Sequence, residues 1–385
     1  MGGKIGACPS SNRASKEART AALALRPGQG SLPTGAGSLA VTTAWWHPER
    51  FAKRLPLLEK RARIVDGFRS WFAAQGFLEV DTPALQVSPG LEPHLIAFAT
   101  ELVRPEGERL TRYLHTSPEF TMKKLLVAGL PRIFQMGHVF RNGERAGRHS
   151  PEFTMLEWYR VRDGYRTLMA DCEALVRRAA ALAGATTLRW QGHEADPLQP
   201  FEVLTVPDAF QRHCGIDLLA TAPDPLAPDL ALLTAAAAPL GIRPHPGDSW
   251  EDLFFRIMLD RIEPHLGMGR PTFLADYPIS MAALARPKPE DPRLAERFEL
   301  YACGVELANA FGELTDPVTQ RARFEADMDL KQRLYGERYP IDEDFLDALA
   351  HGMPPSAGSA LGLDRLIMLA VHADEIDEVL WAPVQ

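Results

Sequence analysis

The sequence predicts an α+β fold in which an antiparallel sheet is flanked by helices. The first observation is a stripe of apolar residues over 57–72 with helical spacing, followed by Gly76, a residue typical of helix ends. The second is a pair of strand-like segments within 133–159, separated by a Gly-containing turn. The third is another set of strand-like segments at 298–314. Strands joined by short turns pair antiparallel, and helices must then cover the sheet.

The remaining elements follow from local patterns. Pro56 stands where a helix begins at no hydrogen-bond cost, and a strand predicted at 77–83 stops at a proline. Further helices are predicted at 165–183, at 316–335 and at 363–371, and the last of these is apolar enough to be buried.

Composition indicates an ordinary globular protein without a membrane segment. The 385 residues are 46% hydrophobic and 24% charged, and the formal net charge is -8. An acidic chain lacks the overall electrostatic footprint for nucleic acid, although a local basic patch would still allow RNA binding. No apolar run approaches the length that spans a bilayer. The four cysteines show no CxxC pair and no metal-ligand spacing, so we expect reduced thiols and a cytoplasmic location.

Two regions differ from the rest of the chain. Residues 1–44 are rich in Gly, Ser, Ala, Thr and Pro, and Glu17 is their only acidic residue. We expect a disordered tail or a start codon assigned too far upstream, and an acid-poor transit peptide is the alternative. Residues 45–385 are expected to form one domain, with a helical or irregular insertion at about 184–270 in which no chemistry is evident.

The arginine-rich turn within 133–159 carries the strongest chemical signal. Arg141 precedes the turn, and Phe153 and Glu157 follow it. An antiparallel hairpin brings these side chains near one another, so that a cation, an aromatic face and a carboxylate meet a phosphate, an adenine and an amine. A carboxylate that attacks the α-phosphate of ATP needs no general base, but it needs a bidentate cation. The turn therefore predicts an adenylate-forming enzyme; the alternative is that Arg141 forms a surface salt bridge.

A second group of polar residues lies on the predicted strands at 298–314. Glu299 and Glu306 flank a turn at Cys303 and Gly304, and on one hairpin they would share a Mg²⁺ ion held mainly by ATP phosphates. The alternative is two solvated glutamates.

Three residues further along the same segment, Asn309, Phe311 and Glu313, alternate and therefore share one face of a strand. A buried ammonium needs a carboxylate partner, which Glu313 and Glu157 would supply. The alternative is the polar face of an exposed strand.

Two shorter motifs complete the predicted site. In the Gly-rich segment 358–365, small residues allow close approach of a ligand, and Arg365 would hold the γ-phosphate. The alternative is a packed turn in which Arg365 pairs with Asp364. Glu119 precedes a helix beginning near Phe120, where it would either cap that helix or bind an ammonium.

Taken together, these segments resemble the catalytic domain of class IIb lysyl-tRNA synthetase, from about residue 50 to the C-terminus. The resemblance implies the class II aminoacyl-tRNA synthetase catalytic fold, ATP and Mg²⁺ as cofactors, and a homodimer through the first helix and strand. It implies catalytic roles for Arg141 and Arg365. The ATP-binding residues that it implies are Arg141, Asn142, Glu144, His149, Phe153, Glu299, Glu306 and Arg365, with Glu299 and Glu306 as metal ligands. The amino-acid-binding residues that it implies are Glu119, Glu157, Tyr159, Asn309, Phe311, Glu313 and Ala360.

Departures from lysyl-tRNA synthetase refine the resemblance. The five strands of an anticodon-reading OB barrel are not seen before the first motif, and we therefore expect no tRNA partner. Gly143 stands where the family has glutamate, which is displaced to Glu144, and Ala360 stands where the family has glycine. These traits are similar to the stand-alone elongation factor P β-lysine ligase family. That likeness implies ATP-dependent activation of (R)-β-lysine, or of lysine, and its transfer to a lysine of elongation factor P. The alternatives are a truncated lysyl-tRNA synthetase that charges tRNA and a non-catalytic regulatory paralog.

Overall fold

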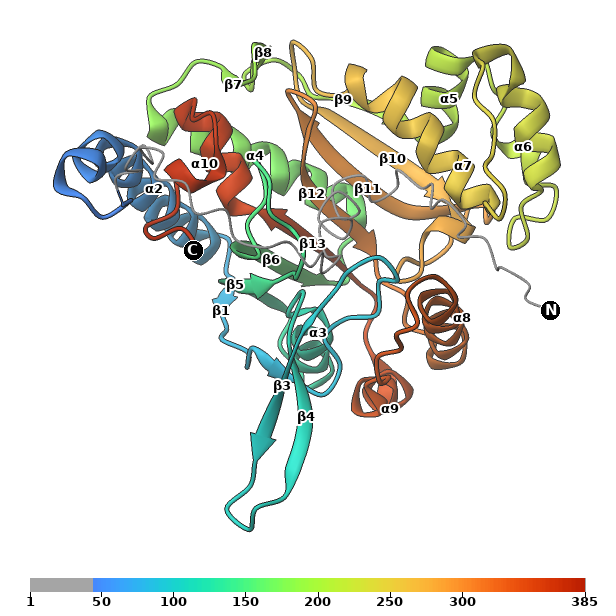
Figure 1. Ribbon diagram of the computed structural model, residues 1–385, viewed down its shortest axis with the longest axis horizontal. Helices are drawn as coiled ribbons and strands as arrows, with labels where there is room; N and C mark the ends of the chain where they lie inside the picture. The colour runs from blue at the N-terminus through green and yellow to red at the C-terminus, as the bar shows by residue number, and fades with distance from the viewer. Residues whose placement is uncertain (1–43, 385) are drawn as a thin grey trace, which may run out of the picture.

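The computed structural model describes residues 44–384, so the tail predicted at 1–44 lies outside the described residues apart from Ala44. The main sheet has eight strands, and Figure 1 shows helices on both sides of it. In order across the sheet, its strands are β1 (Leu78–Glu79), β5 (Arg132–Phe140), β6 (Glu152–Val161), β13 (Ser356–Gly362), β12 (Val305–Gly312), β11 (Leu294–Ala302), β10 (Thr272–Pro278) and β9 (Glu202–Thr205). Only the outermost pairs, β1–β5 and β9–β10, are parallel. The predicted α+β class is confirmed.

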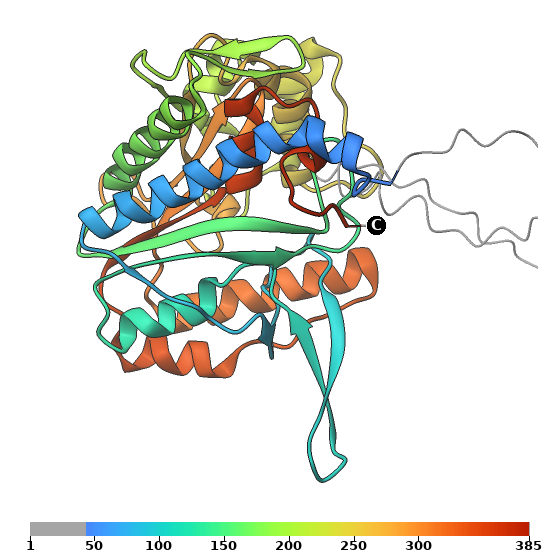
Figure 2. The ribbon, with the colours of Figure 1, turned by 90° about the vertical axis from the view of Figure 1, so that its left-hand side faces the viewer.

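Helices cover both faces of the sheet, as the side view in Figure 2 shows. One layer consists of α2 (Pro48–Ala74), α4 (Tyr165–Ala183) and α10 (Leu363–Val371). The opposite layer consists of α3 (Glu119–Val127), α8 (Pro317–Tyr335) and α9 (Glu343–Gly352). A third group packs against the β10 end of the sheet and consists of α5 (Val206–Cys214), α6 (Leu230–Ala237) and α7 (Trp250–Ile257). The helices predicted at 165–183, 316–335 and 363–371 are confirmed.

The first helix and strand differ from the prediction at their boundaries. Helix α2 begins at Pro48 rather than at Pro56, because Pro48 itself takes the first helical turn, where a missing N–H costs nothing. Pro56 lies inside the helix, where it removes one main-chain hydrogen bond. Strand β1 is only two residues long, because its pairing with β5 is limited to Leu78 and Glu79.

The segment at 184–270 contains strands that the sequence did not predict. It includes a short hairpin of β7 (Leu188–Trp190) and β8 (His193–Ala195), and β9 pairs with β10 at the edge of the main sheet. These strands are three or four residues long, too short for an alternating pattern to distinguish them from coil. The segment therefore extends the sheet in addition to supplying the helices α5, α6 and α7.

A separate three-stranded sheet is formed by β2 (Leu85–Gln86), β3 (Phe98–Val103) and β4 (Arg109–Leu114). Its β3–β4 hairpin projects away from the body of the molecule (Figures 1 and 2). Among the helices between residues 44 and 384, none is both long and apolar enough to cross a bilayer.

The β11–β12 hairpin shows how the sheet aligns site residues. Its two-residue turn, Cys303 and Gly304, has φ angles of 54° and 71°, and two positive φ angles match the twist of tight hairpins. The resulting register sets Glu306 opposite Tyr301 and Asn309 opposite Glu299. The predicted hairpin with carboxylates on both strands is therefore present.

Candidate active site

A cavity of about 410 Å³ lies where β6, β12 and β13 meet α3 and α8. All predicted site residues except Asn142 and Glu299 line it. They are Glu119, Arg141, Glu144, His149, Phe153, Glu157, Tyr159, Glu306, Asn309, Phe311, Glu313, Ala360 and Arg365. Residues from five helices and strands, from the turn between β5 and β6 and from the position after β12 thus meet in one cavity, which combines a carboxylate-rich end and an arginine-rich end.

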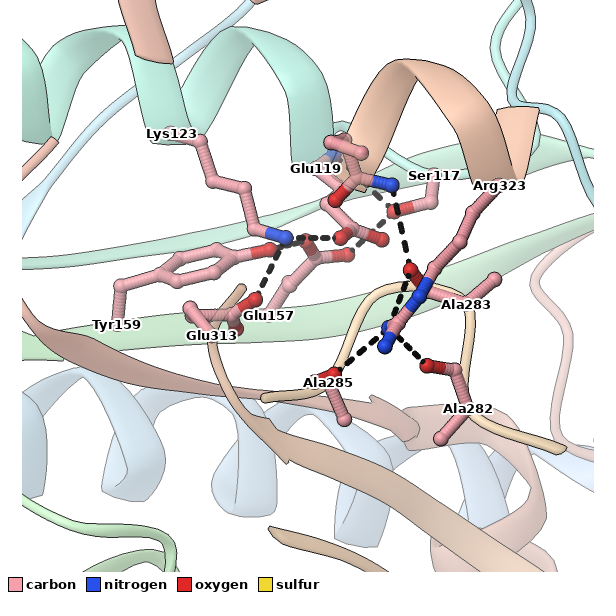
Figure 3. Close-up of polar contacts among 11 residues, drawn as sticks. Ser117, Glu119, Lys123, Glu157, Tyr159, Ala282, Ala283, Ala285, Glu313 and Arg323 are labelled. Carbon is pink, nitrogen blue, oxygen red and sulfur yellow. Dashed lines mark hydrogen bonds and ion pairs between the residues drawn. The ribbon is translucent and has the colours of Figure 1, made fainter. Parts of the chain in front are cut away.

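The carboxylate-rich end, which we call the ammonium end, is built on Glu157 of β6 (Figure 3). Ser117 Oγ donates a hydrogen bond of 2.7 Å to Glu157 Oε2, and Tyr159 OH donates one of 2.5 Å to Oε1. Burial and the nearby charge of Glu119 raise the pKa of Glu157 to about 8. A bound ammonium would offset the free-energy cost of ionising the buried Glu157 and would favour its carboxylate form.

Glu119 and Glu313 are bridged by a residue that the sequence interpretation did not include, Lys123. Its Nζ contacts Glu119 and lies 2.5 Å from Glu313 Oε2 (Figure 3). Burial works against the charged form of Lys123, but the two carboxylates outweigh it and raise its pKa above the ordinary value. The available signal was the four-residue spacing of Glu119 and Lys123, which places both on one face of α3. Glu119 does not cap the helix, because α3 begins at Glu119 itself and Pro118 stands at the cap position; Ser117 Oγ accepts the hydrogen bond of the Glu119 main-chain amide.

The floor of the ammonium end is formed by β13. A Cβ at Gly358 would lie 2.2 Å from Tyr159 Cε1 and 2.6 Å from Glu313 Oε1, so no side chain fits there. Ala360 stands in register between Glu157 of β6 and Asn309 of β12. Its methyl group therefore lies between two of the predicted substrate contacts.

Another part of the cavity wall is the segment at 281–285, which α8 holds in position. Arg323 Nη1 donates hydrogen bonds of 2.6, 3.1 and 2.9 Å to the carbonyl groups of Ala282, Ala283 and Ala285 (Figure 3). Gln320 Nε2 donates a further one of 3.2 Å to Ala283 O. Four hydrogen bonds from one helix thus fix a loop whose members line the cavity.

The arginine-rich end, which we call the nucleotide end, is built on Arg141 at the end of β5. Its guanidinium lies 5.3 Å from the centroid of the Phe153 ring, as the hairpin prediction required. Within residues 44–384, Arg141 Nε is buried and has no hydrogen-bond partner. A buried donor without a partner is costly, and an anionic ligand would remove that cost.

Arg365 and His149 complete the nucleotide end. Arg365 Nη1 donates a hydrogen bond of 3.1 Å to Glu306 O, and Asp364 instead pairs with Arg61 and accepts from the Thr154 amide. The alternative in which Arg365 pairs with Asp364 is therefore wrong. Burial and the nearby Arg365 lower the pKa of His149 to about 3.

The predicted metal ligands are not equivalent. Glu299 accepts hydrogen bonds of 2.7 Å from Arg297 Nη2 and from Tyr301 OH, and it does not line the cavity. Glu306 does line it, and burial followed by the charge of Glu299 raises the pKa of Glu306. Over residues 44–384, no group of three or more His, Cys, Asp or Glu side chains could hold a metal. This donor set fits a Mg²⁺ ion that takes one or two carboxylates and its other ligands from phosphate and water.

Asn142 also lies outside the cavity lining. The main-chain N–H of Asn142 donates a hydrogen bond of 2.7 Å to Ile96 O, which ties the end of β5 to the segment before β3. The neighbouring Glu144 does line the cavity.

Comparison with known proteins identifies the family. Residues 45–385 match the family described as tRNA synthetases class II (D, K and N). The chain belongs to this family. The protein named elongation factor P–(R)-beta-lysine ligase in Enterobacter sp. (strain 638) is 40% identical over 342 residues, which cover 88% of this chain and 97% of that relative. The protein of the same name in Yersinia enterocolitica is 40% identical over 346 residues, which cover 89% of this chain and 98% of that relative.

These relatives confirm the resemblance found in the sequence. The class II family accounts for the antiparallel sheet, and the ligases are matched along nearly their whole length. The predicted fold and the predicted membership of a ligase branch are therefore both confirmed.

Proposed function

We propose that this protein uses ATP to activate (R)-β-lysine and then transfers it to a lysine side chain of elongation factor P. The observation that carries the proposal is the polarity of the cavity, which has carboxylates at one end and arginines at the other. A diammonium acid matches this polarity, because its ammonium groups and its carboxylate need opposite charges. The names of the relatives support the same reaction.

In this proposal, Arg141 contacts both the substrate carboxylate and the α-phosphate. The carboxylate attacks that phosphorus, an acyl-adenylate forms, and pyrophosphate leaves. Arg141 acts by electrostatic stabilisation, because its bidentate guanidinium faces the point where negative charge gathers. Phe153 offers a face for adenine, while Asn142, Glu144, His149 and Arg365 are assigned to the rest of the nucleotide.

The ammonium end binds the rest of the substrate. Glu119, Glu157 and Glu313 supply carboxylates for the two ammonium groups, and Tyr159 and Asn309 supply polar contacts beside them. Phe311 and Ala360 line the space for the carbon chain. A buried ammonium is stable only with carboxylate partners, so the cavity selects against amino acids with neutral side chains.

We assign Mg²⁺ to Glu306 and Glu299, where it would neutralise charge on the ATP phosphates. In the second step, an uncharged lysine ε-amine of elongation factor P attacks the acyl carbonyl. An amide bond forms, AMP leaves with the bonding electron pair, and the amine releases one proton. The proposal further assigns the protein to the cytoplasm, as a homodimer that contacts its partner through α2 and β1, without tRNA or membrane.

Mass spectrometry of elongation factor P tests the proposal. Incubation with the protein, ATP, Mg²⁺ and (R)-β-lysine should add the mass of one β-lysyl group at a single lysine. Omission of ATP and the Arg141→Ala variant serve as controls that should leave the mass unchanged. Unmodified elongation factor P, together with acylated tRNA in a parallel reaction, would refute the proposed acceptor.

A further inference from the structure

Lys123 is buried beside the proposed amino-acid site, yet the proposed reaction does not use it. Its side chain is 0% exposed, and it does not line the cavity. Glu119 and Glu313, which do line the cavity, lie between Lys123 and the substrate space. The Lys123 ammonium thus reaches the two carboxylates from behind the cavity wall.

The charges of the ammonium end show what this arrangement does. Three carboxylates gather there, on Glu119, Glu157 and Glu313, and Lys123 contributes one permanent ammonium. A substrate such as β-lysine brings two more ammonium groups. Three carboxylates then face three ammonium groups, and the buried charges balance, as buried charges must if they are to be stable.

We propose that Lys123 is a positioning residue that acts as an internal third ammonium, holding Glu119 and Glu313 in place and limiting the cavity to substrates with two ammonium groups. This inference rests on the proposed function, because it concerns the selection of that substrate. Lys123 does not touch the substrate and acts only through the two carboxylates.

The surroundings of Lys123 explain why its charge matters. Glu119 faces it from α3, Glu157 and Tyr159 from β6, and Glu313 from the position that follows β12, while Arg286 adds a positive charge near Glu313. On the side of α9 the neighbour is apolar, with the Phe345 ring centroid 6.0 Å from Nζ. Without the ammonium, buried carboxylates would face one another, and repulsion would favour their protonated forms at neutral pH.

The test replaces Lys123 by methionine, which keeps the shape of the chain and removes the charge. In ATP–pyrophosphate exchange, Lys123→Met should raise KM for (R)-β-lysine by about 10- to 100-fold, the range for a lost charge-assisted contact. KM for ATP should stay within about twofold, and the pH at which KM for β-lysine is lowest should move upward. The matched control is Lys124→Met, since Lys124 pairs with Asp342 and Asp344 on the α9 side and does not line the cavity.

A second variant distinguishes charge from packing. Lys123→Arg keeps the positive charge and should hold KM for β-lysine closer to wild type than Lys123→Met does. If packing alone mattered, the order would reverse, because arginine overfills the site and methionine does not. Wild-type KM in Lys123→Met, or the reversed order, would overturn the inference. Absence of exchange in the wild-type protein would instead refute the proposed function.

Discussion

The two ends of the cavity differ in how their charges are arranged. At the ammonium end, Lys123 lies between Glu119 and Glu313, and Glu157 accepts hydrogen bonds from Ser117 and Tyr159. At the nucleotide end, like charges gather. Burial and the nearby Arg365 lower the pKa of Arg148, and the same arginine contributes to the low pKa of His149.

This difference indicates what each end of the cavity requires from its ligand. The ammonium end holds its carboxylates in a hydrogen-bonded and ion-paired network, so the proposed substrate would enter a preformed site. The nucleotide end brings Arg148 and Arg365 together, where they repel each other although the carboxylate of Glu306 lies nearby. A polyanion such as ATP would remove that repulsion and provide Arg141 Nε with an acceptor. The comparison therefore predicts that mutations at one end change mainly amino-acid binding and that mutations at the other end change mainly adenylation.

The largest effect is expected at the nucleotide end, from Arg141→Ala. Loss of one charge-assisted contact at the transition state costs about 2–4 kcal/mol, or about 10²–10³ in rate. We expect kcat for ATP–pyrophosphate exchange to fall by that factor, with a smaller rise in KM for β-lysine because Arg141 also contacts the substrate carboxylate. Turnover near that of the wild type would show that Arg141 does not stabilise the transition state.

A large effect is also expected at the ammonium end, from Gly358→Ala. The new methyl group would collide with Tyr159 and Glu313, and overpacking typically costs about 1–3 kcal/mol. KM for β-lysine should therefore rise by about 10- to 100-fold, with KM for ATP unchanged. Gly164→Ala is the matched control, because a Cβ there meets nothing within 4 Å. An equal change in KM for β-lysine in the two variants would contradict the conclusion that no side chain fits at Gly358.

The pH dependence gives a third test, confined to the ammonium end. Binding two ammonium groups requires ionised Glu157 and Glu313, whose pKa values are raised by burial to about 8 and about 7. Because two carboxylates must lose a proton, apparent affinity for β-lysine should increase by about 50-fold between pH 6 and 7, and binding should release protons, measurable by calorimetry in buffers of different ionisation enthalpy. A pH-independent affinity would show that these carboxylates do not titrate on binding.

The same raised pKa values predict the opposite trend for stability without substrate. Both folded-state values exceed the ordinary carboxyl value of 4.5. Their contribution to the free energy of unfolding is fully present below about pH 4.5 and is lost as the pH rises through about 7 to 8. Glu157→Gln removes the share of Glu157, because glutamine does not titrate. Between pH 6 and pH 8.5, the free energy of urea unfolding should therefore fall less in Glu157→Gln than in the wild type, and an equal fall would contradict the raised pKa of Glu157.

The smallest effect is expected from Ala360→Gly. Removing one methyl group between Glu157 and Asn309 should change the free-energy discrimination between two substrates by at most about 1–3 kcal/mol. The ratio of kcat/KM for α-lysine to that for β-lysine should rise, since the enlarged floor admits the α-amino isomer. An unchanged ratio would show that the methyl group does not select between the isomers.

The sequence predicted the local features of the site better than those that depend on distant contacts. The 133–159 hairpin followed from alternation and a Gly-containing turn, and it joined Arg141 to Phe153 as expected. Lys123 was missed, because its role depends on Glu313, which follows β12 and is far from α3 along the chain. The sequence interpretation treated Glu299 and Glu306 alike. In the structure, Arg297 and Tyr301 donate hydrogen bonds to Glu299 and not to Glu306. Strand β9 was missed because its partner β10 lies far along the chain.

The most direct test of the account is ATP–pyrophosphate exchange with three amino acids. These are (R)-β-lysine, α-lysine and norleucine, which has the lysine chain without the distal ammonium. We predict exchange with (R)-β-lysine, weaker exchange with α-lysine, and none above background with norleucine. No exchange with either lysine, or equal exchange with norleucine, would contradict the claim that the cavity activates a diammonium acid.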